Sequence, residues 1–472
     1  MTGVYLGLLV ILASFTAGCA TQSYQDKPLA PGATFSGYEA RTLDSAELRT
    51  FLEQNLKQET ALWPPTSWDL DRLTLAAFYY HPDLDLARAK WGVAEAGIIT
   101  AGQRPNPQLL PGLIQYNSDA PTGVSPWTIG AVIDIPIETA GKRGYRITQA
   151  KQQSQTARFQ IASAAWQVRS RVRASLVELY PMEPILERQL TLQQEILKML
   201  DRRLAVGLAS QPEVTQARLS LSRIELTLNE IRKQRAQQRA RLAAALGLPL
   251  NALNTVTLSL SALEQVPLLI AIPKQEAQRQ ALLNRPDILA ALSEYETSQA
   301  ALRLEIAKQY PDLHPQPGYT WDAGASKWAL GLALELPILN RNEGPVAEAK
   351  ARREQAAANF NVLQARAIGE VEQALAGYEF ALGKLTAAEA ALSGQRQSER
   401  ATTAAFKAGE ADRLQLVSAE FETASAEQAR TEVFIQTQQS VGQLEDALQR
   451  PLNGTVLPLS QIDDPRQRKV PR

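Results

Sequence analysis

The sequence predicts a mainly α-helical protein with a membrane β-barrel, built from two copies of one unit in which a strand pair precedes a long α-helical hairpin. Three observations predict this class. The chain repeats itself about 200 residues further on, each copy holds a segment of alternating apolar and polar residues, and a very long helical stretch follows each segment. The length of 472 residues alone would suggest two or three ordinary domains, but the repeat favours two matching halves.

The internal repeat rests on five anchors that occur in the same order in both halves, at offsets between 201 and 204 residues. Such regular spacing indicates a duplication, so each half is interpreted as one structural unit. We expect a first repeat at 76–251, a linker at 252–280 and a second repeat at 281–453. The anchors pair His81-Pro82-Asp83-Leu84 with Arg285-Pro286-Asp287-Ile288, Pro107-Gln108-Leu109 with Pro311-Asp312-Leu313, Trp127 and Pro136 with Trp328 and Pro337, Val206-Gly207 with Ala408-Gly409, and Pro249-Leu250-Asn251 with Pro451-Leu452-Asn453.

The N-terminus predicts an exported protein with a lipid anchor. The apolar run at 4–15 suits the core of a signal peptide and is too short to span a membrane as a helix. Cys19 follows this run and two small residues, and so resembles the lipidated cysteine of bacterial lipoproteins, although Thr16 stands where that pattern usually has leucine. The alternative is an unmodified cysteine. We expect a signal peptide at 1–18 and a lipid-anchored, extended segment at 19–75.

Composition excludes several function classes. The 49 basic residues are matched by 49 acidic ones, which argues against a nucleic-acid binder, and the basic residues of the tail at 454–472 are read as solvated. A single cysteine excludes an intrachain disulfide and a thiolate metal cluster. The sequence has no Gly-rich phosphate loop, nucleophile elbow or helical histidine pair, and its two histidines, His81 and His314, each adjoin a proline. We therefore expect no catalytic residue, no cofactor and no metal site.

Each repeat is expected to begin with an alanine-rich helix. In the first copy, Pro82 occupies the first helical turn, where its missing N–H costs nothing, and Pro105 ends the helix at about residue 103. In the second copy, Pro286 and Pro311 take the same two places. Both helices therefore lead directly into the segments that are expected to form strands.

A strand of about eleven residues is expected in each repeat, at 127–137 and at 328–338. One face of each strand is apolar, and the other carries small or polar residues, with Asp134 and Glu335 at equivalent places. A tilted transmembrane strand has this length, and a tryptophan at one end suits the aromatic girdle of a membrane barrel. The apolar positions are Trp127, Ile129, Ala131, Ile133, Ile135 and Ile137 in the first copy, and Trp328, Leu330, Leu332, Leu334, Leu336 and Ile338 in the second.

Two further segments, 108–117 and 312–322, could each supply a partner strand. Four strands cannot close a barrel, and open strand edges do not persist in hydrocarbon, so several chains would contribute to one barrel. Alternation alone leaves another interpretation open, in which the amphipathic strands pack on a soluble core.

A helical hairpin is expected after each strand pair. Residues 142–204 would reach about 90 Å at 1.5 Å per residue, so this stretch must pack along other helices. Pro181 and Pro184 predict a kink or a local break within it. The expected turns are Val206-Gly207-Leu208 and the segment around Gly409, and the other expected helices run from 212 to about 246, from 345 to 407 and from 412 to about 448.

This combination of repeat, strand pairs and hairpins resembles the outer-membrane factor family typified by TolC, over nearly the whole mature chain. The segments that resemble the family are 282–288 (LLNRPDI), 307–313 (AKQYPDL), 206–208 (VGL) and 136–147 (PIETAGKRGYRI). Within the last segment, Gly141-Lys142-Arg143 resembles the CzcC-like branch, which serves resistance-nodulation-division (RND) pumps for heavy-metal cations.

The resemblance implies a trimeric α/β-barrel channel-tunnel in the outer membrane. Three chains would close one barrel, and their helical hairpins would form a tunnel across the periplasm. The implied partners are two further copies of the chain, outer-membrane lipid, a periplasmic adaptor (membrane fusion) protein and an inner-membrane RND-type pump. Glycine suits the tight hairpin turns whether or not an adaptor binds there. The residues implied at the adaptor-facing ends are Val206, Gly207 and Leu208, with Ala408, Gly409 and Glu410.

The entrance of the implied tunnel departs from the family pattern, because Gln415 and Ser418 stand where aspartates are common. Glu213, Glu410 and Asp412 could instead form an acidic ring that favours cations. The alternative for each is a carboxylate that stabilises the start of its own helix.

The expected function is therefore a passive exit duct of a tripartite efflux pump, with no enzymatic activity. Heavy-metal cations are the first expected substrate class, and drugs or other small organic molecules are the alternative. A lipid-anchored periplasmic coiled-coil scaffold is the alternative function.

Overall fold

The computed structural model describes residues 24–56, 62–254, 256–267 and 274–452. The chain divides into two compact units, residues 1–41 and 42–472. Helix α2 (Pro31–Glu39) belongs to the first unit, and none of its residues is buried. The second unit contains both repeats.

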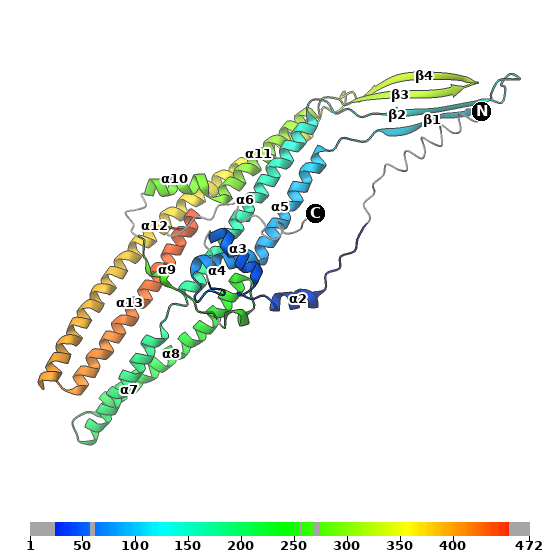
Figure 1. The fold of residues 1–472 in the computed structure, drawn as a ribbon. Helices are drawn as coiled ribbons and strands as arrows, with labels where there is room; N and C mark the ends of the chain where they lie inside the picture. The colour runs from blue at the N-terminus through cyan, green and yellow to red at the C-terminus, as the bar shows by residue number, and fades with distance from the viewer. Residues whose placement is uncertain (1–23, 57–61, 255, 268–273, 453–472) are drawn as a thin grey trace. The chain divides into compact units, whose positions relative to one another are not determined.

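Both repeats present the same order of elements: a helix, a strand pair and a helical hairpin (Figure 1). The first repeat consists of α5 (Pro82–Gly102), β1 (Gln108–Tyr116), β2 (Trp127–Asp134), α6 (Lys142–Val177), α7 (Glu183–Ala205) and α8 (Gln211–Leu246). The second consists of α11 (Pro286–Ala307), β3 (Leu313–Asp322), β4 (Ala325–Leu334), α12 (Glu343–Ala408) and α13 (Arg413–Leu448). In each repeat the two arms of the hairpin pack against each other, and α13 also packs against α7.

The two repeats differ in the first arm of the hairpin. In the second repeat α12 is a single helix of 66 residues, about 100 Å long at 1.5 Å per residue. In the first repeat the same stretch is divided into α6 and α7, the interruption at 178–182 contains Pro181, and Pro184 is the second residue of α7. The expected break at these prolines is therefore present, since proline removes a backbone donor and clashes with the preceding turn. Within the described helices, none combines the length and apolar character needed to cross a bilayer.

The prediction that the segment 19–75 is extended is wrong. The described part of this segment contains α2, α3 (Ala46–Leu56) and the start of α4 (Leu70–Tyr80). Leu48, Phe51 and Leu52 recur at the i, i+3, i+4 spacing of one helix face and are all buried. This face packs in a core that also contains residues of α4, α6 and the end of α8. Phe51 and Trp68 are buried in this core and Trp63 packs against it, so these aromatic residues mark a folded helical layer.

The linker between the repeats meets this N-terminal layer. Trp68 is buried and forms a parallel bridge with Leu258, where the backbone N–H of Trp68 donates to the Thr257 carbonyl at 2.9 Å. The backbone N–H of Ser259 donates to the Trp68 carbonyl at 2.9 Å. The linker is itself partly helical, with η1 (Leu250–Leu253), α9 (Ser261–Glu264) and α10 (Lys274–Asn284).

The four strands form one antiparallel sheet in the order β1-β2-β3-β4, so each repeat contributes one hairpin of the sheet. The repeats join at its centre, where β2 pairs with β3. Successive residues point to opposite faces of the sheet. One face is apolar and exposed in the single chain: Trp127 and Ile129 are 45% and 48% exposed, and Trp328 and Leu330 are 83% and 80% exposed. The other face carries small and polar residues, namely Thr128, Gly130, Val132 and Asp134 on β2, His314, Gln316, Gly318, Thr320 and Asp322 on β3, and Ala325, Lys327, Ala329, Gly331 and Ala333 on β4.

The strand expected at 127–137 is paired with β3 to its end, because the Ile135 N–H donates to the Pro315 carbonyl at 3.1 Å and Ile137 forms an antiparallel bridge with Leu313. The strand expected at 328–338 ends earlier than predicted. The strand β4 ends at Leu334, so Glu335, expected to be a strand residue, lies one position beyond β4. The reason is the length of the partner: β3 begins at Leu313, directly after a proline and an aspartate, and Leu313 pairs with Leu334. Asp134 is the last residue of β2 and lies on the polar face.

A buried ion cluster joins the two repeats below the sheet. Glu445 of α13 is 3% exposed, and its carboxylate accepts a hydrogen bond at 2.8 Å from Arg169 of α6. Arg173 of α6 lies at 3.2 Å from the same oxygen and also donates to the backbone carbonyl of Gln438 at 2.8 Å. Burial lowers the pKa of the Arg173 guanidinium, while the charge of Glu445 opposes that change. The cluster is therefore a pair of buried cations whose charge is offset by one buried carboxylate.

Equivalent helix ends show how the copies have diverged. Gly247 ends α8 and Gln449 ends α13, and both adopt the left-handed conformation, with φ of +72° and +47°. Only glycine suits the first site without rearrangement, because a Cβ on Gly247 would lie 2.8 Å from the carbonyl oxygen of Tyr80.

Gly247→Ala is therefore expected to destabilise the protein by about 1–3 kcal/mol, from the left-handed backbone and this close contact. The measurement is the urea-induced unfolding of the purified protein. The control is Gly144→Ala in α6, where an added Cβ would meet nothing within 4 Å and alanine favours the helix. Equal unfolding midpoints for the two variants would contradict this prediction.

Candidate functional site: hairpin ends, sheet junction and sheet face

The first hairpin ends in a tight turn at the three predicted residues. Gly207 has a φ of +75°, and its N–H donates to the Leu204 carbonyl at 3.0 Å. The N–H of Leu208 reaches back to the Arg203 carbonyl at 2.7 Å. Together these bonds satisfy carbonyls at the end of α7 and require a residue that tolerates positive φ. Val206 and Leu208 remain 69% and 76% exposed on either side of the glycine.

The second hairpin repeats this geometry. Gly409 has a φ of +78°, its N–H donates to the Phe406 carbonyl at 3.1 Å, and the N–H of Glu410 donates to the Ala405 carbonyl at 2.9 Å. Ala408 and Glu410 are exposed. Each hairpin thus ends in a glycine turn with an exposed residue on both sides, and the first turn is the more apolar of the two.

Two of the three predicted entrance carboxylates have a local structural role. Glu213 forms a capping box with Ser210 at the start of α8, where its carboxylate accepts from the Ser210 backbone N–H at 2.6 Å. Asp412 caps α13 in a second box with Gln415, whose N–H donates to the Asp412 carboxylate at 2.8 Å. Glu410 is exposed in the turn itself. Gln415, which stands where an aspartate is common in the outer-membrane factor family, is therefore one of the two residues of this capping box.

Asp412 also ties the two hairpins together. Its carboxylate accepts a hydrogen bond from Arg203 of α7 at 2.6 Å. A second ion pair joins Arg413 of α13 to Glu195 of α7 at 2.9 Å. The pKa of Asp412 is lowered, first by the hydrogen bond from the Gln415 backbone and then by Arg203. The side chains of Leu192, Val417 and Ala424, with Ile196, Met199 and Phe421 against them, form a small apolar cluster between these two helices.

The lowered pKa gives a pH prediction. A carboxylate with a lowered folded-state pKa stabilises the protein above its unfolded pKa of about 4, and this contribution is lost as the pH falls through the lowered value. Asp412→Asn keeps a helix-capping side chain and removes the ion pair with Arg203. We expect a loss of less than about 1 kcal/mol at pH 7, because the pair is exposed, and no difference from the unsubstituted protein near pH 2. Urea unfolding at the two pH values measures this, and a difference that persists near pH 2 would contradict the assignment.

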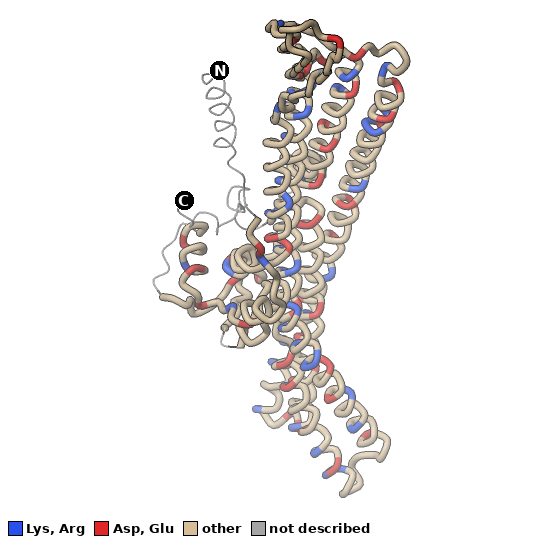
Figure 2. The backbone as a smooth tube through the Cα atoms, turned by 90° about the vertical axis from the view of Figure 1, so that its right-hand side faces the viewer, with Lys and Arg blue, Asp and Glu red and all other residues tan. Residues whose placement is uncertain are grey.

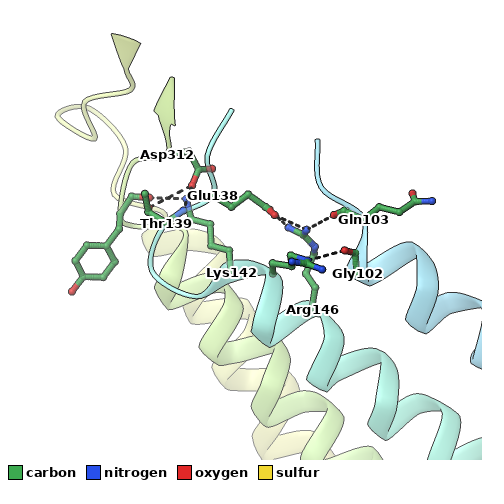
Figure 3. Close-up of polar contacts among 9 residues, drawn as sticks. Gly102, Gln103, Glu138, Thr139, Lys142, Arg146 and Asp312 are labelled. Atoms are coloured by element: carbon green, nitrogen blue, oxygen red, sulfur yellow. Dashed lines mark hydrogen bonds and ion pairs between the residues drawn. The ribbon is translucent and has the colours of Figure 1, made fainter. Parts of the chain in front are cut away.

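The segment that carries the CzcC-like resemblance forms the joint between sheet and helices (Figure 3). Lys142 lies at the start of α6 and is 7% exposed. Its Nζ donates to the Asp312 carboxylate at 2.8 Å and to the Tyr310 carbonyl at 2.7 Å. Asp312 also accepts from the backbone N–H of Thr139 at 2.8 Å. The end of α11 and the start of β3 are thus bound to the start of α6 across the repeat boundary.

The other side of this joint binds α5. Arg143 Nε donates to the Gly102 carbonyl at 2.7 Å, and Arg146 Nη2 donates to the carbonyl of Gln103, the C-cap of α5, at 3.4 Å (Figure 3). Arg146 Nη2 also donates to the carboxylate of Glu138 at 2.9 Å. Sequence reasoning identified the Gly-Lys-Arg segment but missed Asp312, the partner of Lys142, and the nearby ion pair between Arg146 and Glu138. The available signal was the repeat anchor at Pro311-Asp312, where the second copy has an acidic residue in the place of Gln108 of the first.

Residues of both charge signs are interspersed along the helices (Figure 2). Across the part of the chain that the structure describes, no group of three or more His, Cys, Asp or Glu residues could hold a metal ion. His81 caps α5, where its Nδ1 accepts from the Asp83 N–H at 3.2 Å. His314 lies on the polar face of the sheet, with Nδ1 at 3.0 Å from the Asp134 carboxylate.

Comparison with known proteins agrees with this architecture. The outer membrane efflux protein family matches residues 77–248 and 277–449. Among curated proteins, the chain is similar to the cobalt-zinc-cadmium resistance protein CzcC of Cupriavidus metallidurans, with 28% identity over 72% of this chain and 79% of that protein.

Solved structures resemble the chain in fold. The outer membrane protein VceC of Vibrio cholerae matches with a TM-score of 0.63 at 21% identity, covering 81% of this chain and 97% of VceC. The outer-membrane channel OprN matches with a TM-score of 0.65 at 17% identity, covering 91% of this chain and 99% of OprN. The family match spans two long segments that hold both strand pairs and both hairpins, so the chain belongs to the outer membrane efflux protein family.

Proposed function

We propose that the chain is the exit duct of a tripartite efflux pump: a passive, trimeric channel through the outer membrane and the periplasm. The observation that carries this proposal is the two-faced sheet. Its apolar face is exposed in the single chain while its polar face carries small residues, which is the pattern of a membrane barrel around an aqueous interior.

Closure of the barrel requires further copies of the chain. The sheet ends at β1 and β4, and among the described residues neither strand has a partner on its outer edge. Open edges are not tolerated in hydrocarbon, so β4 of one copy pairs with β1 of the next in the proposed trimer. Three four-stranded sheets give a barrel of twelve strands.

The helices support the same assembly. Large apolar side chains remain exposed on α5, where Val93 and Ile99 are 75% and 72% exposed, and on α12, where Val362 and Phe380 are 68% and 75% exposed. Exposed apolar side chains on long helices favour packing of these helices against neighbouring helices. In the proposed trimer, other copies cover these faces and the helices enclose a tunnel.

The glycine turns at the hairpin ends are the proposed contact with a periplasmic adaptor protein, which links the duct to an inner-membrane RND-type pump. Val206 and Leu208 support this role because they present apolar side chains on a rigid, exposed turn. Glu410 and the capping carboxylates Glu213 and Asp412 lie at the same end, and they are the proposed acidic ring of a cation-favouring entrance, although Asp412 is paired with Arg203 within the chain. Lipidation of Cys19 is proposed from the sequence, and this residue lies outside the described part of the chain.

Heavy-metal cations are the proposed substrate class. The support is the similarity to a protein whose name assigns it to cobalt, zinc and cadmium resistance, together with the Gly141-Lys142-Arg143 segment. Small organic molecules are the alternative, because the solved structures establish only the fold.

The deciding experiment is growth of a strain that lacks this protein on graded zinc, cobalt, cadmium, nickel and copper, beside a panel of dyes and antibiotics. Sensitivity confined to metals, and restored by the intact gene, is expected. Sensitivity confined to organic compounds would overturn the substrate class and leave the duct architecture in place.

A further inference from the structure

A compact polar cluster lies at the end of the sheet that adjoins the helices. His314 Nδ1 is 3.0 Å and 3.2 Å from the two oxygens of the Asp134 carboxylate. Gln316 Nε2 donates to one of these oxygens at 3.2 Å. The three residues come from β2 and β3, the two strands at which the repeats meet, and all three side chains lie on the polar face.

The cluster is largely shielded from solvent, but it remains accessible from the polar face of the sheet. The Asp134 side chain is 14% exposed and that of His314 is 34% exposed. The neighbours of the cluster on β4 are small, because His314 pairs with Ala333 and Gln316 pairs with Gly331, and on β1 Asp134 pairs with the polar residue Gln108. An ion that travels along the polar face therefore has access to the imidazole and the carboxylate, while the strands hold both groups in position.

The spacing of these groups suits a chelate. Two donor atoms that are each about 2.1 Å from one metal ion, at about 90° to each other, are about 3 Å apart. The Nδ1 and carboxylate oxygen have this separation, so a metal ion can take the place of the hydrogen between them. The Gln316 amide turns its oxygen toward the same point by rotation about its last bond, since amide oxygen and nitrogen are nearly equivalent in shape. Water completes an octahedral set, in which neighbouring donors are at about 90°.

We propose that His314, Asp134 and Gln316 form a binding station for a divalent transition-metal cation of the zinc class, on the interior face of the duct. Imidazole nitrogen beside carboxylate oxygen selects zinc, cobalt and nickel over calcium and magnesium, which prefer oxygen ligands alone. The inference deepens the proposed function and rests on it, because the polar face is the interior only in the closed barrel. One protein nitrogen and two oxygens make a weak site, which suits an ion that must also leave.

The test combines two measurements on the full-length protein, purified in detergent without a histidine tag. The first is calorimetric titration with zinc sulfate, where about one zinc per chain is expected. The second is single-channel potassium conductance in planar bilayers, where zinc is expected to reduce the current reversibly. His314→Gln keeps a polar partner for Asp134 but removes the imidazole, and is expected to weaken both effects about tenfold or more. Thr320→Ala is the matched control, on the same face of the same strand.

The outcomes separate the inference from the function on which it rests. Zinc binding that is equal in His314→Gln and the unsubstituted protein, or no zinc binding at all, would overturn the station. Zinc binding that depends on His314 in a protein that carries no current in bilayers would overturn the proposed duct instead. Gln316→Glu adds a second carboxylate, and is expected to tighten zinc binding relative to the unsubstituted protein if the three side chains act together.

Discussion

Leu330→Lys is expected to prevent stable insertion of the protein into the outer membrane. Leu330 lies within β4, on the apolar face, and is 80% exposed in the single chain. A lysine on the lipid face of a membrane strand costs about 2–4 kcal/mol near the bilayer centre, and the proposed trimer would carry three such residues. The measurement is the amount of trimer in the outer-membrane fraction.

The matched control is Ala329→Lys, one residue earlier in the same strand. Ala329 pairs with Gly318 and lies on the polar face, where a lysine would meet water in the duct. We expect normal insertion and a changed ion selectivity. Equal loss of both variants would show that the two faces do not separate lipid from water. Retention of both would favour the lipid-anchored scaffold.

Glu445→Ala is expected to lower the free energy of unfolding strongly, because it removes the carboxylate of the buried ion cluster. The substitution leaves Arg169 and Arg173, 8% and 5% exposed, as buried cations without their carboxylate. Removal of one partner from a buried ion pair costs about 3–5 kcal/mol, because the remaining charge is desolvated and unpaired. Since Glu445 lies on α13 and both arginines lie on α6, we expect the two repeats to separate at a lower urea concentration.

The control for Glu445 is Glu348→Ala in α12. Glu348 pairs with Arg352, but the two side chains are 62% and 70% exposed, and such surface pairs contribute less than about 1 kcal/mol. The urea midpoint measures both variants. A midpoint shift for Glu445→Ala no larger than that for Glu348→Ala would contradict the role assigned to the buried cluster.

Features with a strong local signal could be predicted from the sequence. The hairpin turns follow from Gly207 and Gly409, which adopt the positive φ that the helix ends require. The break in the first long helix follows from Pro181 and Pro184. The alternation at 127–137 identified the two faces of the sheet, because successive side chains along a strand point to opposite faces.

Features that depend on distant partners could not be predicted. Strand length is set by pairing, and Glu335 lies outside β4 because β3 begins only at Leu313. The link between Lys142 and Asp312 joins residues 170 positions apart, which no periodicity reveals. The helical layer formed by α3 and α4 was missed for a different reason: its i, i+3, i+4 spacing was present at Leu48, but prolines and tryptophans nearby suggested irregular chain.

The pairing of β2 with β3 has an evolutionary consequence. In the proposed trimer, a hairpin from the first copy always neighbours hairpins from the second, both within a chain and between chains. An unduplicated ancestor could close the same ring with six identical subunits, and gene fusion then freed the copies to specialise. The position that starts α5 and α11 records this: it holds His81, a local cap, in one copy and Arg285 in the other, where the guanidinium reaches Glu370 at 2.7 Å and the Ala447 carbonyl at 2.9 Å. A three-fold assembly thereby contains two different kinds of strand hairpin, and the proposed metal station takes one residue from the first copy and two from the second.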